Sequence, residues 1–363
     1  MLTTTPKIDG FRMPAEFEAQ KQVFMLWPER PDVWHNNAEQ AVKVFQEVAK
    51  AISRFTKVTV GVSATHFEQA DNMISSFGRV VKMEHDDVWT RDVGPTFVIN
   101  DKGQIRGIDW EFNAWGGLEE GAYYPWDLDN SVAESILKLE NIESYKTKDF
   151  VLEGGSIHVD GKGTLLTTEE CLLNSNRNPE LSKKQIENKL KDYLNVEKII
   201  WLKKGLYNDE TDGHIDNICC FAREAEVILA WTDDKNSPNY SICREAYEIL
   251  SKETDANGRS FTIHKLYLPK PIYITKEEDE GLLHQDNAKC FSTEEPLPAS
   301  YVNFLITNGG IILPVFKDEM DESAIETLKN IFPKKQIIPV YSREIIIGGG
   351  NIHCITQQQP KWK

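Results

Sequence analysis

The chain has 363 residues and a formal net charge of −16, which disfavours nucleic-acid binding because that binding depends on basic patches. A hydrophobic fraction of 40% with 27% charged residues is typical of a globular protein. We expect neither a membrane span nor a signal peptide, because no long apolar run is present. Enzymes and binding proteins for small molecules remain, and an acidic chain is compatible with a cationic ligand.

The first part of the chain alternates between strand and helix patterns, and a dense polar segment, 84–95, follows the second strand. The predicted elements are a helix over 37–55, a strand over 57–62, a helix from a capping box at 65–68, a strand over 79–83 and a hairpin of 96–99 and 105–110.

The same order then recurs: a strand, polar residues at its end, a hairpin and a helix. The next predicted elements are a helix near 132–137, a strand end at 150–152, a hairpin of 156–159 and 164–168, a helix capped by Ser182 and a strand over 198–202. After these we predict strands over 218–221 and 227–231, a helix near 242–250, a strand over 260–268, a hairpin of 301–306 and 311–315, a helix near 325–331 and a strand over 336–340.

Two spacings between polar strand ends are equal. Asp92 and Glu153 are 61 residues apart, and so are Glu153 and His214, while the 140 residues from His214 to Cys354 leave room for two further units and an insertion. Repeats of this size predict a radial or solenoid array. In an array that closes on itself, the equivalent strand ends meet at one centre, which would gather Asp92, Glu153, His214, Asp216 and Cys354.

One segment, residues 275–298, departs from this pattern because it is polar and acidic. It is interpreted either as a solvated surface loop or as a mobile flap over a site.

Near the C-terminus, a predicted apolar strand over 345–347 leads into three glycines and then Cys354. Glycines allow a backbone to approach a ligand closely, so the cysteine is a candidate nucleophile; the alternative is a buried structural thiol. The six cysteines, at positions 171, 219, 220, 243, 290 and 354, form no regular disulfide framework. Their pattern favours a reducing, cytoplasmic location. We assign Cys171, Cys219 and Cys220 to the core.

The candidate residues together favour a cationic substrate. A thiol and an imidazole with one orienting group suffice for acyl transfer, so two additional carboxylates, Asp92 and Asp216, suit a planar cation. Guanidinium presents five donors in a fixed fork, and carboxylates accept them in pairs. The pattern therefore indicates attack on the central carbon of a guanidinium.

Four motifs resemble the signatures of guanidine-modifying enzymes with the pentein fold, most closely those of agmatine deiminases: WTRDVGP at 89–95, EGGS at 153–156, DGHID at 212–216 and GGGNIHC at 348–354. The likeness extends to 10–18, 27–31 and 113–117, and so covers nearly the whole chain. It implies an α/β fold, a five-bladed α/β propeller of ββαβ repeats with pseudo-fivefold symmetry, as a single catalytic domain over residues 1–363.

The resemblance also implies roles for individual residues. Cys354 is the expected nucleophile, His214 the general acid and base, and Glu153 the group that orients His214. Asp92 and Asp216 are expected to hold the guanidinium, and Trp89 and Trp115 to line the cleft and face the cation. The implied reaction converts agmatine to N-carbamoylputrescine and ammonia, in polyamine metabolism, without a metal or an organic cofactor. The implied assembly is a homo-oligomer, either a dimer or a tetramer.

Several alternatives remain open at this stage. A deiminase of free or peptidyl arginine would share the chemistry, and a catalytically silent guanidine-binding protein would share the site. Metal binding by His214 and Asp216, or by residues 84–87, is disfavoured because no zinc-type spacing is present. In an extended segment His353 would face away from Cys354, as a packing residue, and Arg91 would face away from Asp92. Arg343 is the arginine elsewhere that could enter the cleft.

Overall fold

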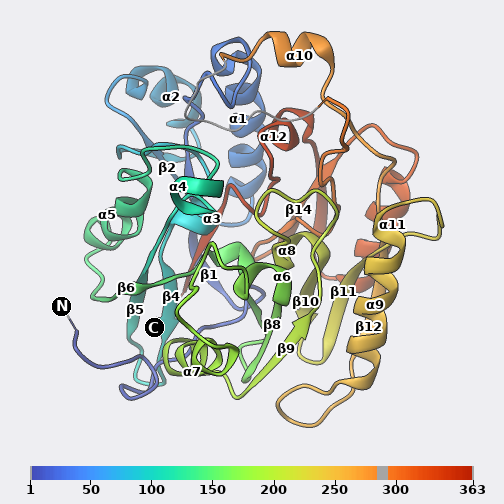
Figure 1. The fold of residues 1–363 in the computed structure, drawn as a ribbon. Coiled ribbons are helices and arrows are strands. Elements are labelled where there is room, and N and C mark those ends of the chain that lie inside the picture. Colours follow the sequence, from blue (N-terminus) through green and yellow to red (C-terminus); the bar gives the residue numbers. More distant parts are fainter. Residues whose placement is uncertain (1, 284–292, 362–363) are drawn as a thin grey trace.

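The computed structural model describes residues 2–283 and 293–361. Within these residues the strands form five sheets, and four of them consist of three strands in the same arrangement (Figure 1). In each, the central strand pairs antiparallel with the strand before it and parallel with the strand after it. These sheets are β4 (Thr96–Ile99), β5 (Ile105–Glu111) and β6 (Ser144–Val151); β7 (His158–Val159), β8 (Thr164–Thr168) and β9 (Lys198–Leu202); β10 (Cys219–Arg223), β11 (Glu226–Trp231) and β12 (Thr262–Tyr267); and β13 (Leu305–Ile306), β14 (Gly310–Val315) and β15 (Gln336–Tyr341).

The fifth sheet joins the two ends of the chain. Its order is β16 (Gln357–Pro360), β1 (Gln20–Leu26), β2 (Lys57–Val62) and β3 (Arg79–Lys82). β16 runs antiparallel to β1, with Gln357 opposite Phe24, and β2 runs parallel to β1. This sheet therefore repeats the pattern of the others and adds one parallel strand. The sequence analysis assigned neither β1 nor β16.

A helix connects the two parallel strands of every sheet, because parallel neighbours require a crossover. These helices lie on the outside of the molecule (Figure 1). They are α1 (Glu39–Ser53), α2 (Phe67–Ile74), α5 (Val132–Leu139), α7 (Lys183–Leu194), α9 (Asn239–Lys252) and α11 (Asp321–Ile331). In α7 the buried side chains are Ile186, Leu190 and Leu194, the helical spacing that the sequence shows. The capping box predicted at Ser182 is present, whereas the one predicted at 65–68 is not, since α2 begins without a side-chain cap.

Short helical turns occupy the connections between sheets: α3 (Thr90–Val93), η3 (Gly154–Ser156), α8 (Ile215–Ile218) and α12 (Arg343–Ile347). The remaining short helices are η1 (Asn36–Ala38), α4 (Gly117–Glu120), η2 (Asp129–Ser131), α6 (Glu169–Leu172) and α10 (Lys276–Glu280).

The strand predicted over 345–347 is wrong, since these residues lie in α12. The amides of Ile345 and Ile346 both donate to the carbonyl of Ser342, and the three isoleucines are fully buried. A short apolar run indicates burial but does not distinguish a buried strand from a buried helix.

The acidic segment 275–298 is described except for 284–292. Its first part contains α10, which begins at a capping box between Thr275 and Glu278. Glu278 binds Arg343 at 2.7 Å, and the amide of Leu283 donates to the carbonyl of Pro31. The described part of the segment is therefore attached to the body of the protein. Arg343 is held in this contact and does not line the pocket above Cys354.

Five cysteines are described, and all five are buried and free. Cys171, Cys219 and Cys220 lie in the core as predicted, while Cys290 lies outside the described residues. In the part of the chain that the structure describes, we find no helix with the length and apolar character needed to cross a membrane.

Candidate active site

The five connections from the last strand of one sheet to the first strand of the next converge on one place. Each contributes at least one buried polar side chain there: Asp92 from α3, Glu153 from the residue before η3, His214 and Asp216 from the start of α8, Asn303 from the residues before β13, and Cys354 from the residues before β16. Asn303 is the residue that the sequence analysis did not find, because the insertion before it interrupts the repeat.

Gly155 lies between three of the predicted residues. A methyl group added to it would lie 2.5 Å from His214 Nδ1, 2.9 Å from Asp92 Oδ1 and 3.0 Å from Asp216 Oδ2. Its amide donates to Asp92 Oδ1 at 2.8 Å. The second glycine of the EGGS motif is thus required because a side chain would displace the imidazole and both carboxylates.

The thiol of Cys354 lies beside Asp216 and Asn303. Its Sγ is 3.7 Å from Asp216 Oδ2, and the Asn303 side-chain amide donates to it at 3.1 Å. Asn303 Oδ1 accepts from the amide of His353 at 2.9 Å. Asn303 therefore fixes both the sulfur and the backbone that carries it.

The three glycines before Cys354 permit close packing of tryptophans. A side chain on Gly350 would come within 2.4 Å of Trp89, and one on Gly348 within 2.5 Å of Trp34. Gly349 has a φ of +102°, which side chains rarely adopt. The three glycines therefore allow the indoles of the pocket wall to pack closely and the backbone to turn at Gly349.

Glu153 is held from behind by Arg177, a buried residue that the sequence analysis did not identify. Arg177 Nε donates to Glu153 Oε1 at 2.6 Å, and its Nη1 binds Asp212 Oδ2 and the carbonyl of Trp115, each at 2.6 Å. Glu153 Oε2 is buried without a hydrogen-bond partner and lies 4.0 Å from His214 Nε2, which also lacks one. This arrangement leaves one Glu153 oxygen near the imidazole, at a distance longer than a hydrogen bond.

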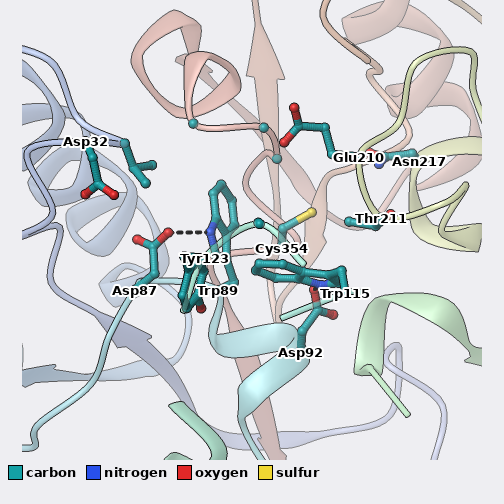
Figure 2. A pocket seen from close by; sticks show the side chains of 15 residues that line it. Asp32, Asp87, Trp89, Asp92, Trp115, Tyr123, Glu210, Thr211, Asn217 and Cys354 are labelled. Carbon is teal, nitrogen blue, oxygen red and sulfur yellow. Dashed lines mark hydrogen bonds between the residues drawn. The ribbon is translucent and has the colours of Figure 1, made fainter. Parts of the chain in front are cut away.

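A pocket opens above Cys354, and acidic and aromatic side chains surround it. In Figure 2 Asp32 and Asp87 lie on one side of the thiol and Glu210 on the other, with the indoles of Trp89 and Trp115 between them. The lining residues are Asp32, Val33, Asp87, Trp89, Asp92, Trp115, Ala122, Tyr123, Glu210, Thr211, Asn217, Gly348, Gly349, Gly350 and Cys354. None of these described residues is a lysine or an arginine.

Trp89 and Trp115 both line the pocket, and the indole of each donates to a carboxylate. Trp115 Nε1 donates to Asp92 Oδ2 at 3.0 Å, and Trp89 Nε1 donates to Asp87 Oδ2 at 2.8 Å (Figure 2). The rings contact each other edge to face, with centroids 6.4 Å apart. The indoles therefore line the pocket and also fix the orientation of two of its acids.

His353 is not the packing residue that we expected. Residues 352–355 form a turn rather than an extended strand, so the alternation of faces does not apply. His353 is buried and binds Asp216 at 2.8 Å and Glu16 at 2.9 Å. Arg91 does lie away from the pocket lining, but it does so from a helical turn rather than from a strand.

Burial and neighbouring charge alter the ionisation of three site residues. Burial, aided by Asp216 and Glu153 and opposed by His214, raises the pKa of Asp92 to about 6. Burial and the carboxylates of Asp216 and Asp92 raise the pKa of the Cys354 thiol well above its usual value. Burial disfavours the imidazolium of His214, but contacts with Asp92, Cys171 and Glu153 raise its pKa well above the ordinary value. These shifts favour a protonated thiol and a protonated imidazole in the free site.

Two buried groups of described residues have donor atoms close enough to surround a metal ion: Glu16, His158 and His353, and Glu153, Cys171 and His214. The sequence analysis named neither group. Residues 84–87 belong to neither: His85 binds two backbone carbonyls, and Asp87 binds indole and amide groups.

The chain has a mixed α/β fold, and a distant comparison agrees at the level of fold. The structure aligns with that of a dimethylarginine dimethylaminohydrolase with a TM-score of 0.51 at 12% identity, covering 93% of this chain and 99% of that chain. At that identity the likeness concerns the fold alone.

The family follows from closer matches. The chain belongs to the Porphyromonas-type peptidyl-arginine deiminase family, whose model matches residues 12–360. It is 56% identical over 359 residues to an agmatine deiminase of Pseudomonas aeruginosa, covering 99% of this chain and 98% of that protein. The structure of an agmatine deiminase of Enterococcus faecalis aligns with a TM-score of 0.97 at 50% identity, covering 99% of both chains. The resemblance inferred from the four motifs is thereby confirmed.

Proposed function

We propose that this protein is an agmatine deiminase, which hydrolyses agmatine to N-carbamoylputrescine and ammonia. The observation that carries the proposal is a buried thiol beneath a pocket lined by carboxylates and indoles without a cationic side chain among the described lining residues. Full-length identity above 50% with agmatine deiminases supports the same activity.

In the proposed reaction Cys354 attacks the guanidinium carbon. Asp92 and Asp216 hold the guanidinium nitrogens, and His214 donates a proton to one of the terminal nitrogens, so that the carbon–nitrogen bond breaks and ammonia leaves. The product of this step is an amidino-thioether on Cys354. His214 then removes a proton from water, the oxygen attacks the same carbon, and the carbon–sulfur bond breaks to release N-carbamoylputrescine and the cysteine.

The ionisation of the site suits activation of the thiol by the substrate. The carboxylates of Asp92 and Asp216 disfavour a thiolate in the free site. A bound guanidinium neutralises these carboxylates and places a positive charge beside the sulfur, so that its proton is lost more readily. The thiolate then forms when its electrophile is in place, and its proton leaves to solvent, because His214 already carries the proton that it donates to the departing ammonia.

The acidic rim explains how the far end of agmatine would be bound. Asp32, Asp87 and Glu210 line the pocket away from the thiol (Figure 2). Asp32 is paired with Arg30, so the charge of Asp87 and Glu210 favours the ammonium of the substrate. The indoles of Trp89 and Trp115 suit the aliphatic stem and the cationic group.

The direct test is product analysis with the purified protein. Incubation with agmatine should yield ammonia and N-carbamoylputrescine in equal amounts, while an arginine-containing peptide should yield little ammonia. Ammonia release from the peptide or from L-arginine in preference to agmatine would instead support an arginine deiminase. Binding of agmatine without turnover would support the silent binding protein.

The acid limb of the pH profile should reflect Asp92. The raised pKa of about 6 means that this carboxylate gains a proton as the pH falls below about 6, and the protonated form loses its attraction for the guanidinium. We expect kcat/KM for agmatine to fall about tenfold per pH unit below that value. Steady-state rates from pH 4.5 to 8 measure the limb, and thermal melting at each pH separates it from unfolding. A flat profile down to pH 5 would contradict this assignment.

Replacement of Glu153 should impair catalysis without removing the nucleophile. Glu153→Gln retains the shape of the side chain but loses the charge that faces His214, so we expect kcat to fall by about 10²–10⁴, by analogy with triad orienting groups. The matched control is Glu169→Gln in α6, because this carboxylate binds the exposed Lys183 and Lys203 and its replacement should leave kcat unchanged. An unchanged kcat in Glu153→Gln would exclude Glu153 from the site.

We further infer that the five sheets form a five-bladed propeller around an approximate fivefold axis, as one catalytic domain over residues 1–363. The shared pairing pattern of the sheets and the convergence of all five connections support this arrangement. The free buried cysteines favour a cytoplasmic location.

We expect the protein to form a homo-oligomer, either a twofold dimer or a dimer of dimers. Exposed apolar side chains near the pocket rim, Leu118 at 79% and Tyr124 at 55% exposure, offer a surface for association. Light scattering at micromolar concentration should give a multiple of 41.5 kDa, and a mass equal to that of one chain would contradict the expectation.

A further inference from the structure

A continuous line of buried polar side chains extends from the thiol away from the pocket. Asp216 Oδ2 is 3.7 Å from Cys354 Sγ and 2.8 Å from His353 Nδ1. The second ring nitrogen of His353 is 2.9 Å from Glu16 Oε2. All four residues are buried, with at most 6% exposure. The line thus connects the start of α8, the segment before β16 and the segment before β1.

The Glu16 carboxylate, at the far end of this line, is held in place by other contacts. Its Oε1 accepts from the amide of Ile306 at 2.7 Å, and its Oε2 lies 3.5 Å from His158 Nε2. A backbone amide and a second imidazole therefore hold the carboxylate in place. The imidazole of His353 in turn has each ring nitrogen occupied by an acid.

Asp216 has one oxygen held and one oxygen free. Oδ2 receives the hydrogen bond from His353, whereas Oδ1 is buried without a partner. A buried oxygen without a hydrogen bond is unfavourable, and a donor from a ligand would satisfy it. The terminal torsion of an aspartate is broad, so the bond to His353 is what limits rotation of the carboxylate.

We propose that His353 is a positioning residue for Asp216. Glu16 holds one ring nitrogen of His353, and the other ring nitrogen fixes the Asp216 carboxylate. The free Asp216 oxygen is thereby directed toward the guanidinium of the substrate. The proposal rests on the proposed function, since it concerns how the guanidinium is bound.

The charges around His353 agree with this role. It faces the carboxylates of Glu16 and Asp216, the guanidinium of Arg91, whose Nε is 3.4 Å from its carbonyl, and the ring of His158 at 6.2 Å. Burial and Arg91 lower the pKa of His353, but Glu16 and Asp216 raise it to above the ordinary value. Burial raises the pKa of Asp216, yet its bond to the charged His353 brings it below the ordinary value. Asp216 thus remains ionised for a cation.

Two amide variants separate the two contacts of the ring. The amide nitrogen of an asparagine can replace Nδ1, so His353→Asn retains the donor to Asp216 and loses the contact with Glu16. The amide of a glutamine can replace Nε2, so His353→Gln retains the contact with Glu16 and loses the donor to Asp216. We expect His353→Gln to lower kcat/KM for agmatine by about 10²-fold, mainly through KM, because the carboxylate is misplaced. His353→Asn should lose about tenfold or less.

Binding provides a readout that does not need turnover. In a Cys354→Ser background, calorimetric titration with agmatine should show weaker binding for His353→Gln than for His353→Asn. The Asp216 carboxylate loses its negative charge when the pH falls below its lowered pKa. Loss of the hydrogen bond from His353 should raise the pKa of Asp216. We therefore expect agmatine binding by His353→Gln to be lost at a higher pH than binding by the parent. His264→Gln, which alters an imidazole–carboxylate pair with Glu226 on β12 and β11 outside this line, should leave agmatine binding close to that of the parent.

The outcomes distinguish this inference from the proposed function. If the wild type releases ammonia from agmatine and both His353 variants behave alike, the positioning role is wrong and the function stands. If the wild type releases none, the proposed function fails, and unequal agmatine binding by the two variants would still support the role. A metal ion present in purified wild type and lost in His353→Gln would also overturn it. If circular dichroism shows that His353→Gln does not fold, Glu16→Gln is tested in its place. Unchanged agmatine affinity in Glu16→Gln would then contradict the proposal.

Discussion

Cys354→Ser should lower agmatine turnover by at least about 10⁴-fold, the scale of losing a covalent nucleophile. A serine hydroxyl is far less acidic than a thiol, and the surrounding carboxylates of Asp92 and Asp216 oppose any anion at this position. The alcohol would have to lose its proton next to two acids, so the first step should stop. Ammonia release under substrate saturation measures the effect.

The same experiment identifies the intermediate. A wild-type reaction quenched during turnover should yield a peptide containing Cys354 with the added mass of an amidino group, and Cys354→Ser should not. Cys243→Ser is the control, because Cys243 is a buried thiol in α9, away from the pocket lining. Near-normal turnover in Cys354→Ser, or an adduct on another cysteine, would overturn covalent catalysis at this residue.

Agmatine should exceed L-arginine in kcat/KM by at least about 10³-fold, the scale of discrimination by unpaired buried polar groups. The two substrates differ at the far end, where arginine carries a carboxylate. The described pocket lining offers acids there and no cationic side chain, since Arg343 is bound to Glu278. A carboxylate tail would lose its hydration without a partner, which costs several kcal/mol.

Argininamide separates charge from size in this comparison. It retains the bulk at the α-carbon but lacks the carboxylate, so an electrostatic origin predicts recovery of much of the lost kcat/KM. If argininamide is as poor a substrate as L-arginine, the discrimination is steric. Comparable kcat/KM values for agmatine and L-arginine at neutral pH would contradict the substrate assignment itself.

The predictable part of the site is the part that obeys the repeat. Asp92, Glu153 and His214 stand at equal spacings because the units between them carry no insertion, and each follows a strand that can be recognised from its apolar residues. Asn303 occupies the equivalent position of the fourth connection, but the insertion between β12 and β13 removes the spacing. An asparagine ahead of a short buried strand was the available signal, and it is a weak one.

Other site features depend on contacts that sequence patterns do not encode. Arg177 lies after α6, within a repeat unit rather than at a strand end, and becomes relevant only because it binds Glu153. Glu16 is 337 residues from His353 and meets it only because β1 and β16 are neighbours. The misassigned strand at 345–347 had a similar cause, since burial on all sides removes the periodicity that distinguishes helix from strand.

The pairing of β16 with β1 has a consequence for biosynthesis. A chain emerges from the ribosome with its N-terminal part first, so the sheets β4–β6, β7–β9 and β10–β12 can form during synthesis. β1 can pair with β2 early, but its other edge must wait for residues 357–360, and Glu16 must wait for its partner His353. Cys354 and β16, the strand that completes the sheet of β1, are synthesised only a few residues apart. A chain whose translation stops earlier therefore contains the acidic residues of the pocket but lacks the reactive thiol.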